Sequence, residues 1–185
     1  MMAALLSRVR RTPDRWLHPL RRRKALDVMR ARPRPKILLV ICHGNICRSP
    51  IAGALLKREL APLGIPVHSA GFIGFNRPAP VEAVMAAEHH SVDLSAHRSR
   101  LVTADLVRAV DLIVVMDPGQ RRLICERFGR LPRDVVVLGD FDPTAVDTRT
   151  IRDPVDQKRE VFDEVYERIA RCVRALVPVL GGARS

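Results

Sequence analysis

Hydrophobic residues in this chain of 185 residues gather in short continuous runs, separated by segments in which apolar and polar residues are mixed. A continuous run of leucine and β-branched residues is typical of a strand that is buried on both faces of a sheet. The runs predict four strands, at residues 36–42 (KILLVIC), 67–70, 111–116 (DLIVVM) and 134–138 (DVVVL).

The segments between these runs have the character of helices, bounded by proline and glycine. They predict helices at residues 49–60, 80–90, 104–108, 118–128 and 157–177. The last of them carries one apolar stripe at helical spacing, formed by Phe162, Val165, Ile169, Cys172 and Leu176. Strands that alternate with helices predict an α/β fold, here a three-layer sandwich around a four-stranded parallel sheet.

The N-terminal segment differs from the rest of the chain in its charge. Residues 1–36 hold twelve Lys and Arg against two Asp, whereas residues 37–185 hold twenty basic and eighteen acidic side chains, so most of the net charge of +12 belongs to the first segment. A helix start is expected near residue 12, and Pro19 is expected to interrupt that helix. The stiff sequence RPRP that ends at Pro35 marks a boundary between a basic, partly helical extension (1–35) and the α/β domain (36–185).

A basic extension of this kind suits an anionic membrane surface, a nucleic acid or a targeting role, and it is also consistent with a simple solvated arm. The apolar start MMAALL is too short for the core of a secretory signal. Trp16 is the only aromatic residue in the arm, so no specific nucleic-acid partner is expected. An anionic membrane surface is the partner that we consider for residues 1–35.

Four cysteines are too few for a disulfide scaffold and form no CxxC pair, so neither a disulfide framework nor a zinc site is predicted. Without a secretory signal they suggest a reducing compartment, where thiols are catalytic or buried. We therefore expect a cytoplasmic protein, held at most at the periphery of a membrane, with no metal and no cofactor.

Residues 42–50 read CHGNICRSP and follow directly on the first predicted strand. Ligands of such sheets bind beyond the carboxyl ends of the strands. A loop from a strand into a helix directs N–H groups and the positive helix end at one point, which makes an anion site. Gly44 lets the backbone approach a ligand, and Arg48 adds a fork of donors that matches a phosphate group. Such surroundings favour the thiolate of Cys42, a nucleophile that would face the phosphorus atom.

The string CHGNICRSP resembles the phosphate-binding loop of the low-molecular-weight protein tyrosine phosphatases. The resemblance continues through SAGF (69–72), DLSAHRSR (93–100), Met116-Asp117 and IRDP (151–154), and it leaves only the basic extension unexplained. It implies a phosphatase loop after the first strand and a hydrolase that removes the phosphate of phosphotyrosine through a phosphocysteine intermediate.

The resemblance also implies a role for individual residues. Cys42 would be the nucleophile and Arg48 would clamp the phosphoryl group, while Ser49 would donate a hydrogen bond to the thiolate. Asn45 would hold the loop in a strained conformation, with His97 as its hydrogen-bond partner. The remaining substrate-binding positions of the loop are His43, Gly44, Ile46 and Cys47.

A proton donor is expected opposite the loop, because phosphoryl transfer to a thiolate expels a phenolate. Asp153 precedes Pro154 and matches the family's general acid, which would later accept a proton from the attacking water. An Asp-Pro pair can also simply cap a helix, and Asp142-Pro143 is a second such pair. The position just before the closing helix and the resemblance favour Asp153.

The sequence departs from the family pattern after this Asp-Pro pair. Val155 and Asp156 stand where many relatives carry an aromatic wall of the substrate pocket, so Phe72 or Phe75 is expected to supply that wall unless it belongs to the core. Ile46 is as expected for tyrosine substrates, whereas phosphoarginine-directed relatives tend to carry threonine there.

Two alternatives and one open question accompany this interpretation. A thioredoxin-coupled arsenate reductase of the same fold typically reads RSQ and needs two further cysteines after the third strand, where only Cys125 follows here. A phosphate-binding regulatory module would not need Cys42, Arg48 and Asp153 together. Cys47 is either a reversible disulfide partner of Cys42 or a small buried residue.

The expected substrate is a phosphotyrosine protein, and by analogy with bacterial relatives a tyrosine kinase.

Overall fold

A parallel sheet of four strands forms the centre of the protein, seen in a computed structural model that describes residues 2–181. The order of its strands is β2-β1-β3-β4. Every strand expected from the sequence is present, as β1 (Leu38–Cys42), β2 (Val67–Gly71), β3 (Leu112–Val115) and β4 (Val135–Val137). The chain leaves β1 to build β2 on one side and later β3 on the other, so the carboxyl end of β1 is the switch point where α/β folds bind ligands.

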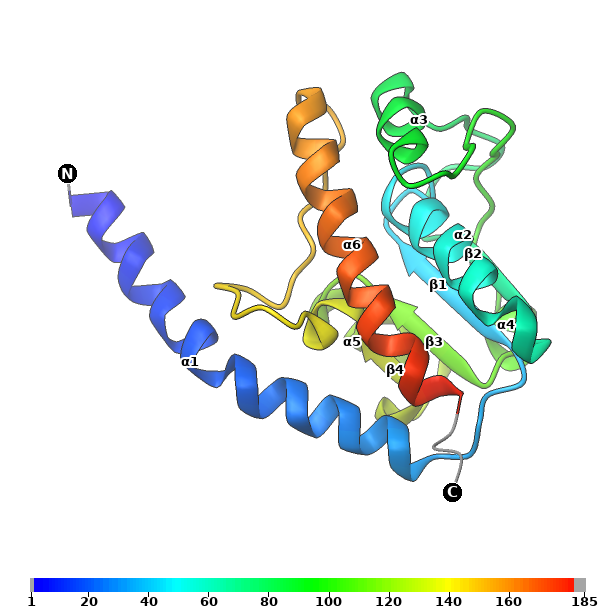
Figure 1. Cartoon of the computed structure of the whole chain (residues 1–185), viewed down its shortest axis with the longest axis horizontal. Coiled ribbons are helices and arrows are strands. Elements are labelled where there is room, and N and C mark those ends of the chain that lie inside the picture. The colour runs from blue at the N-terminus through cyan, green and yellow to red at the C-terminus, as the bar shows by residue number, and fades with distance from the viewer. Residues whose placement is uncertain (1, 182–185) are drawn as a thin grey trace.

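Helices cover both faces of this sheet and complete the three layers (Figure 1). One face packs against α2 (Arg48–Leu60) and α6 (Arg159–Leu180), with α3 (Val81–Glu88) beside α6, and the other face packs against α4 (Ala104–Arg108) and α5 (Pro118–Phe128). Three short 3₁₀ helices, η1 (Ala61–Leu63), η2 (Pro132–Asp134) and η3 (Leu138–Phe141), lie in the connections. The predicted helices are confirmed, although α6 runs to Leu180, beyond the expected end at residue 177.

The hydrophobic runs of the sequence are explained by these two covered faces. Along β1, Leu38 and Val40 belong to the core beneath α2 and α6, while Leu39 and Ile41 belong to the core beneath α4 and α5. Successive side chains of a strand point to opposite faces, and all four are fully buried. A strand between two helical layers therefore needs apolar residues at every position, which explains its continuous hydrophobic run.

Helix α1 (Met2–Ala31) is where the structure departs most from expectation. The predicted interruption at Pro19 is wrong, because the helix continues through it and only bends partway along its length (Figure 1). A proline removes one backbone hydrogen bond and kinks a helix, but packing of the flanking turns can keep the helix continuous. Leu26 and Met29 are buried in the same core as α6, so only one side of α1 is a solvated arm. The domain boundary after residue 35 stays a prediction.

Candidate active site

The loop CHGNICRSP connects β1 to α2 at the switch point of the sheet. Cys42 is the last residue of β1 and Arg48 is the first residue of α2, so the thiol lies beside the N-terminus of a helix. The first turn of a helix has N–H groups without intrahelical partners and a positive dipole end, and both attract anions. Cys42 is buried, and its Sγ accepts a hydrogen bond from Ser49 Oγ at 3.0 Å. The Ser49 hydroxyl thus supplies a hydrogen bond to the sulfur atom that faces the helix end.

Asn45 is the conformational anchor of this loop. It is fully buried and has a φ of 50°, a left-handed conformation that asparagine tolerates better than most residues. Its Nδ2 donates to Ser49 Oγ at 2.8 Å and to Ser69 Oγ at 3.0 Å, and its Oδ1 accepts from the Arg100 backbone N at 3.0 Å. The expected partner His97 is present, with Nε2 2.7 Å from the backbone carbonyl of Asn45. Hydrogen bonds of the side chain and of the backbone of Asn45 thus hold the strained turn in place.

The end of β2 presses directly against the same loop. A Cβ on Gly71 would lie 2.7 Å from the backbone N of Asn45 and 2.8 Å from the carbonyl O of His43. Both distances are shorter than those at which Cβ atoms approach other atoms in proteins, so only glycine fits there. The next two residues hold that carbonyl, since Phe72 N and Ile73 N donate to it at 2.8 and 3.1 Å. The SAGF motif (69–72) therefore belongs to the site, since it supports the backbone of the phosphate-binding loop.

Arg48 and Asp153 meet across the cavity although they are far apart in the sequence. The guanidinium of Arg48 is almost fully buried, and it donates to the carbonyl of Ile151 at 3.1 Å and to the carboxylate of Asp153. The side chain of Asp153 is 41% exposed and lies at the mouth of the loop. Asp142, the competing Asp-Pro residue, is fully buried and accepts hydrogen bonds from two arginines instead. The geometry favours Asp153 as the group that could exchange protons with a substrate.

A cavity of about 210 Å³ opens above the thiol. Its apolar wall consists of Ile46, Ile73 and Val155, whereas Phe72 lines an adjoining cavity together with His43, Arg48 and Asp153. Phe72 packs against the core beneath α4 and α5, and Phe75 is 74% exposed outside the cavity. The remaining lining residues are Cys42, His43, Gly44, Cys47, Arg48, Arg77 and Asp153, of which Arg77 is a cation that no motif had indicated.

Two further groups at the site, Cys47 of the loop and Tyr166 of α6, are held in their neutral forms. Burial raises the pKa of the Cys47 thiol well above its usual range, and the negative charge of Cys42 and Asp153 adds to this effect. Burial likewise raises the pKa of Tyr166, whose hydroxyl donates to the Cys47 carbonyl at 3.1 Å. Tyr166 comes from α6 and fixes the end of the loop, a role without a signal in the local sequence. At neutral pH the thiol and the phenol therefore carry no charge that would compete with an anion.

The fold and the site define a class: α/β proteins with a cysteine and an arginine in an anion-binding loop at the switch point of a parallel sheet. Within this class, a family model described as low molecular weight phosphotyrosine protein phosphatase matches residues 37–184. The chain belongs to this family of hydrolases, and the family resemblance of the sequence is confirmed.

Individual relatives agree with this assignment. The chain is 40% identical over 144 residues to the probable low molecular weight protein-tyrosine-phosphatase EpsP of Ralstonia nicotianae. The aligned region covers 77% of this chain and 94% of that protein. It is similar to the solved structure of the tyrosine phosphatase Wzb from Escherichia coli K30 in complex with sulphate (TM-score 0.70, 30% identity, 77% of this chain and 96% of that one). It is also similar to a mutant of the arginine phosphatase YwlE with a phosphorylated active-site serine (TM-score 0.70, 26% identity, 80% and 97%).

Proposed function

We propose that this tyrosine phosphatase transfers the phosphoryl group of a phosphotyrosine protein to Cys42. The bond between Sγ and phosphorus forms, the bond between phosphorus and the phenolic oxygen breaks, and Asp153 gives its proton to that oxygen. Water then attacks the phosphocysteine, Asp153 takes a proton from it, and the thiolate and inorganic phosphate are released. The observation that carries the proposal is the convergence of Cys42, Arg48 and Asp153 on one cavity.

Each group has the chemistry that its step requires. The loop amides, the N-terminus of α2 and Arg48 supply hydrogen-bond donors that stabilise the negative charge on the transferring phosphoryl group. The Ser49 hydroxyl stabilises Cys42 when it attacks and again when it leaves. In the YwlE mutant the phosphate is carried by the active-site serine, which supports the side chain in the cysteine position as the phosphoryl acceptor.

The substrate ring is the second part of the proposal. Ile46, Ile73 and Val155 give the cavity apolar walls, which suit a phenyl ring better than a charged guanidinium. We therefore infer tyrosine and not arginine as the side chain that carries the phosphate.

Hydrolysis of aryl phosphates tests the chemistry. Wild type should release phosphate and be inhibited by vanadate, Cys42→Ser should be inactive, and Asp153→Ala should lose about 10²–10⁴-fold in turnover. An inert wild type refutes the enzymatic proposal, and arsenate reduction with thioredoxin would assign the reductase alternative. Faster hydrolysis of a phosphoarginine peptide than of a phosphotyrosine peptide would overturn the substrate assignment.

The outer side of α1 supports an anionic membrane surface as a partner. Trp16 and Leu20, one turn apart, are 78% and 65% exposed, while His18 and Met29 on the inward side are buried. Exposed apolar residues flanked by the basic residues of this segment are typical of helices that lie in a membrane interface. No helix within residues 2–181 is both long and apolar enough to cross a bilayer. We propose peripheral attachment at the cytoplasmic surface, with a membrane-associated phosphotyrosine protein, such as a tyrosine kinase, as substrate.

Trp16 is the only tryptophan of the chain and therefore reports on this attachment directly. Its fluorescence should shift to the blue with vesicles that contain anionic lipid and stay unchanged with zwitterionic vesicles. In sedimentation with the anionic vesicles, Leu20→Glu should remain in the supernatant, whereas the matched control Val81→Glu, on an exposed site of α3, should bind like wild type. An unshifted Trp16 or equal binding of all variants contradicts the proposal.

A further inference from the structure

We propose that helix α1 positions the general acid, and that His18 is the positioning residue through which it acts. The inference rests on the proposed role of Asp153. It concerns the acid loop, residues 142–153, which begins at Asp142 and ends at Asp153. The catalytic domain alone does not hold this loop, because one of its contacts comes from the N-terminal extension.

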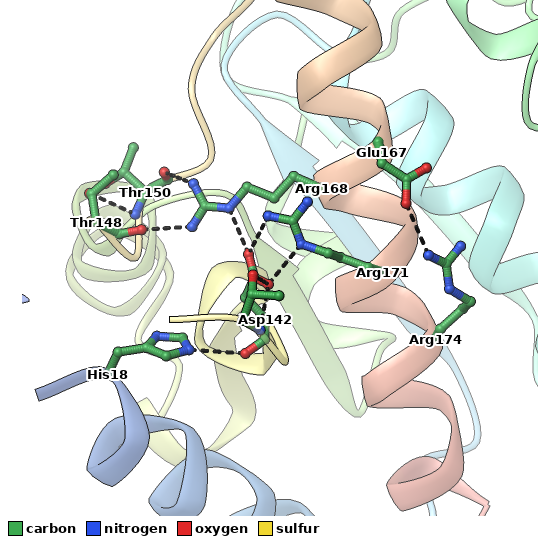
Figure 2. A network of polar contacts seen from close by, with 9 residues as sticks. His18, Asp142, Thr148, Thr150, Glu167, Arg168, Arg171 and Arg174 are labelled. Atoms are coloured by element: carbon green, nitrogen blue, oxygen red, sulfur yellow. Dashed lines mark hydrogen bonds and ion pairs between the residues drawn. The ribbon is translucent and has the colours of Figure 1, made fainter. Parts of the chain in front are cut away.

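The contact is a buried hydrogen bond between α1 and the start of the acid loop. His18 is 5% exposed, and its Nε2 lies 3.0 Å from the backbone carbonyl O of Asp142, 124 residues away in the chain (Figure 2). A carbonyl oxygen can only accept, so the imidazole donates through Nε2. Pro143 and Ala145 of the acid loop lie beside His18 along the same side of α1.

Asp142 connects this contact to helix α6. Its carboxylate accepts hydrogen bonds from Arg168 Nε at 3.0 Å and from Arg171 Nε and Nη2 at 2.8 and 3.0 Å (Figure 2). Burial acts to raise the pKa of Asp142, but hydrogen bonds from Arg171 and Thr144 outweigh it, and the pKa is lowered. The fully buried side chain therefore stays ionised between two guanidinium groups.

Arg168 carries the connection onward along the acid loop. Its Nη1 and Nη2 donate to the carbonyls of Thr150 and Thr148 at 2.9 and 2.6 Å (Figure 2). Ile151 N then donates to the carbonyl of Met116 at 2.9 Å, two residues before Asp153. The loop is thus fixed at its start by His18, near its end by Arg168, and just before Asp153 by Met116, the residue that follows β3.

Loss of the His18 contact leaves a buried carbonyl without its donor at the first of these three points. The loop would relieve this by moving toward water, and Asp142 would move with it, away from Arg168. A general acid misplaced by a fraction of an ångström protonates the leaving oxygen less well. The effect should therefore appear only where the leaving group needs that proton.

The test compares leaving groups in His18→Leu, which has no donor, and His18→Gln, whose amide N–H can replace Nε2–H. For His18→Leu, kcat/KM should fall about five- to tenfold on phenyl phosphate and less than about twofold on p-nitrophenyl phosphate, whose phenolate leaves without a proton. His18→Gln should recover most of the loss on phenyl phosphate. Asp27→Ala, an exposed position of the same helix whose ion pairs with Arg23 and Arg30 stay within α1, should match wild type on both substrates.

Asp153→Asn separates this inference from the proposed function. It should show the same dependence on the leaving group at larger amplitude, and if it does not, the assignment of the acid fails. If Asp153→Asn behaves as expected but His18→Leu loses activity equally on both substrates, or on neither, the positioning role is overturned. A thermal melt of each variant confirms that the rates are compared between folded proteins.

Discussion

The phosphate-binding loop (residues 42–49) and the acid loop face each other across one cavity, but they are held in different ways. The first is fixed mainly by its own backbone, by Asn45 and by the adjoining end of β2, so most of its supports lie at one edge of the sheet. The second is fixed by charged side chains of α6 and by a histidine of α1. Hydrogen bonds and close backbone contacts hold the first loop, whereas the second depends on ionic contacts and a hydrogen bond that α6 and α1 supply.

The largest effect is expected where the phosphate-binding loop has no room to adjust. Gly71→Ala should lower kcat/KM by about 10²-fold, because its Cβ would meet backbone atoms of His43 and Asn45, and a shift of about 1 Å at a reacting centre costs that much. Gly53→Ala is the matched control, since a Cβ there meets only Ser69 Cβ at 3.5 Å. The control should keep its activity and gain about 0.5–1 kcal/mol in stability from the helix. Equal activity of both variants would mean that the loop is not rigidly held.

Asp142→Asn should lower the stability of the protein strongly and should also lower the activity that depends on the acid loop. Removing one partner of a buried ion pair leaves Arg168 and Arg171 uncompensated, which costs about 3–5 kcal/mol in the free energy of unfolding. Activity on phenyl phosphate should fall more than activity on p-nitrophenyl phosphate, as for His18→Leu. Urea titrations and the two substrates measure the two effects, and a stable variant with full activity would exclude Asp142 as the centre of the network.

The same carboxylate makes stability depend on pH. Its pKa is lowered on folding, so its contribution is fully present above the pKa of an unfolded aspartate, about 4, and is lost as pH falls through the lower folded value. The difference in unfolding free energy between wild type and Asp142→Asn should therefore be largest near neutral pH and shrink below about pH 4. A difference that stays constant to pH 3 would show that shape, and not charge, holds the loop.

Tyr166→Phe should have a smaller effect on the phosphate-binding loop. It removes the hydrogen bond to the Cys47 carbonyl and leaves the ring packed, which costs about 0.5–1.5 kcal/mol for one such bond. Turnover should fall only a few-fold, about threefold, because Asn45 and β2 still hold the loop. A loss as large as that of Gly71→Ala would contradict the view that the loop is held mainly from the edge of the sheet.

The two loops also differ in how far the sequence predicts them. The phosphate-binding loop is one contiguous string behind a buried strand, and each of its physical requirements is met by a neighbour in the sequence, so its place in the fold could be inferred. The anchors of the acid loop have no such signal. His18 and Asp142 lie 124 residues apart, and nothing near either residue shows that they meet.

Two other predictions from local sequence fail for the same reason. Pro19 predicts a break that packing of α1 against the core overrides. Phe75 suggested a pocket wall by its type, but it lies exposed outside the cavity, and Ile73 lines the cavity above the thiol. Tertiary packing, which a single sequence does not display, decides each of these cases.

The smallest effect is expected from the second contact between α1 and the acid loop, the ion pair of Arg15 with Asp147. Its atoms are 3.5 Å apart, but the two side chains are 60% and 54% exposed, so water screens the attraction. Arg15→Ala should change the unfolding free energy by less than about 0.5 kcal/mol and kcat/KM on phenyl phosphate by less than about twofold. Comparison with His18→Leu shows whether the buried hydrogen bond of His18 or the surface ion pair of Arg15 couples the helix to the acid. An effect of Arg15→Ala equal to that of His18→Leu would mean that any attachment of α1 suffices, and that His18 has no special part in placing Asp153.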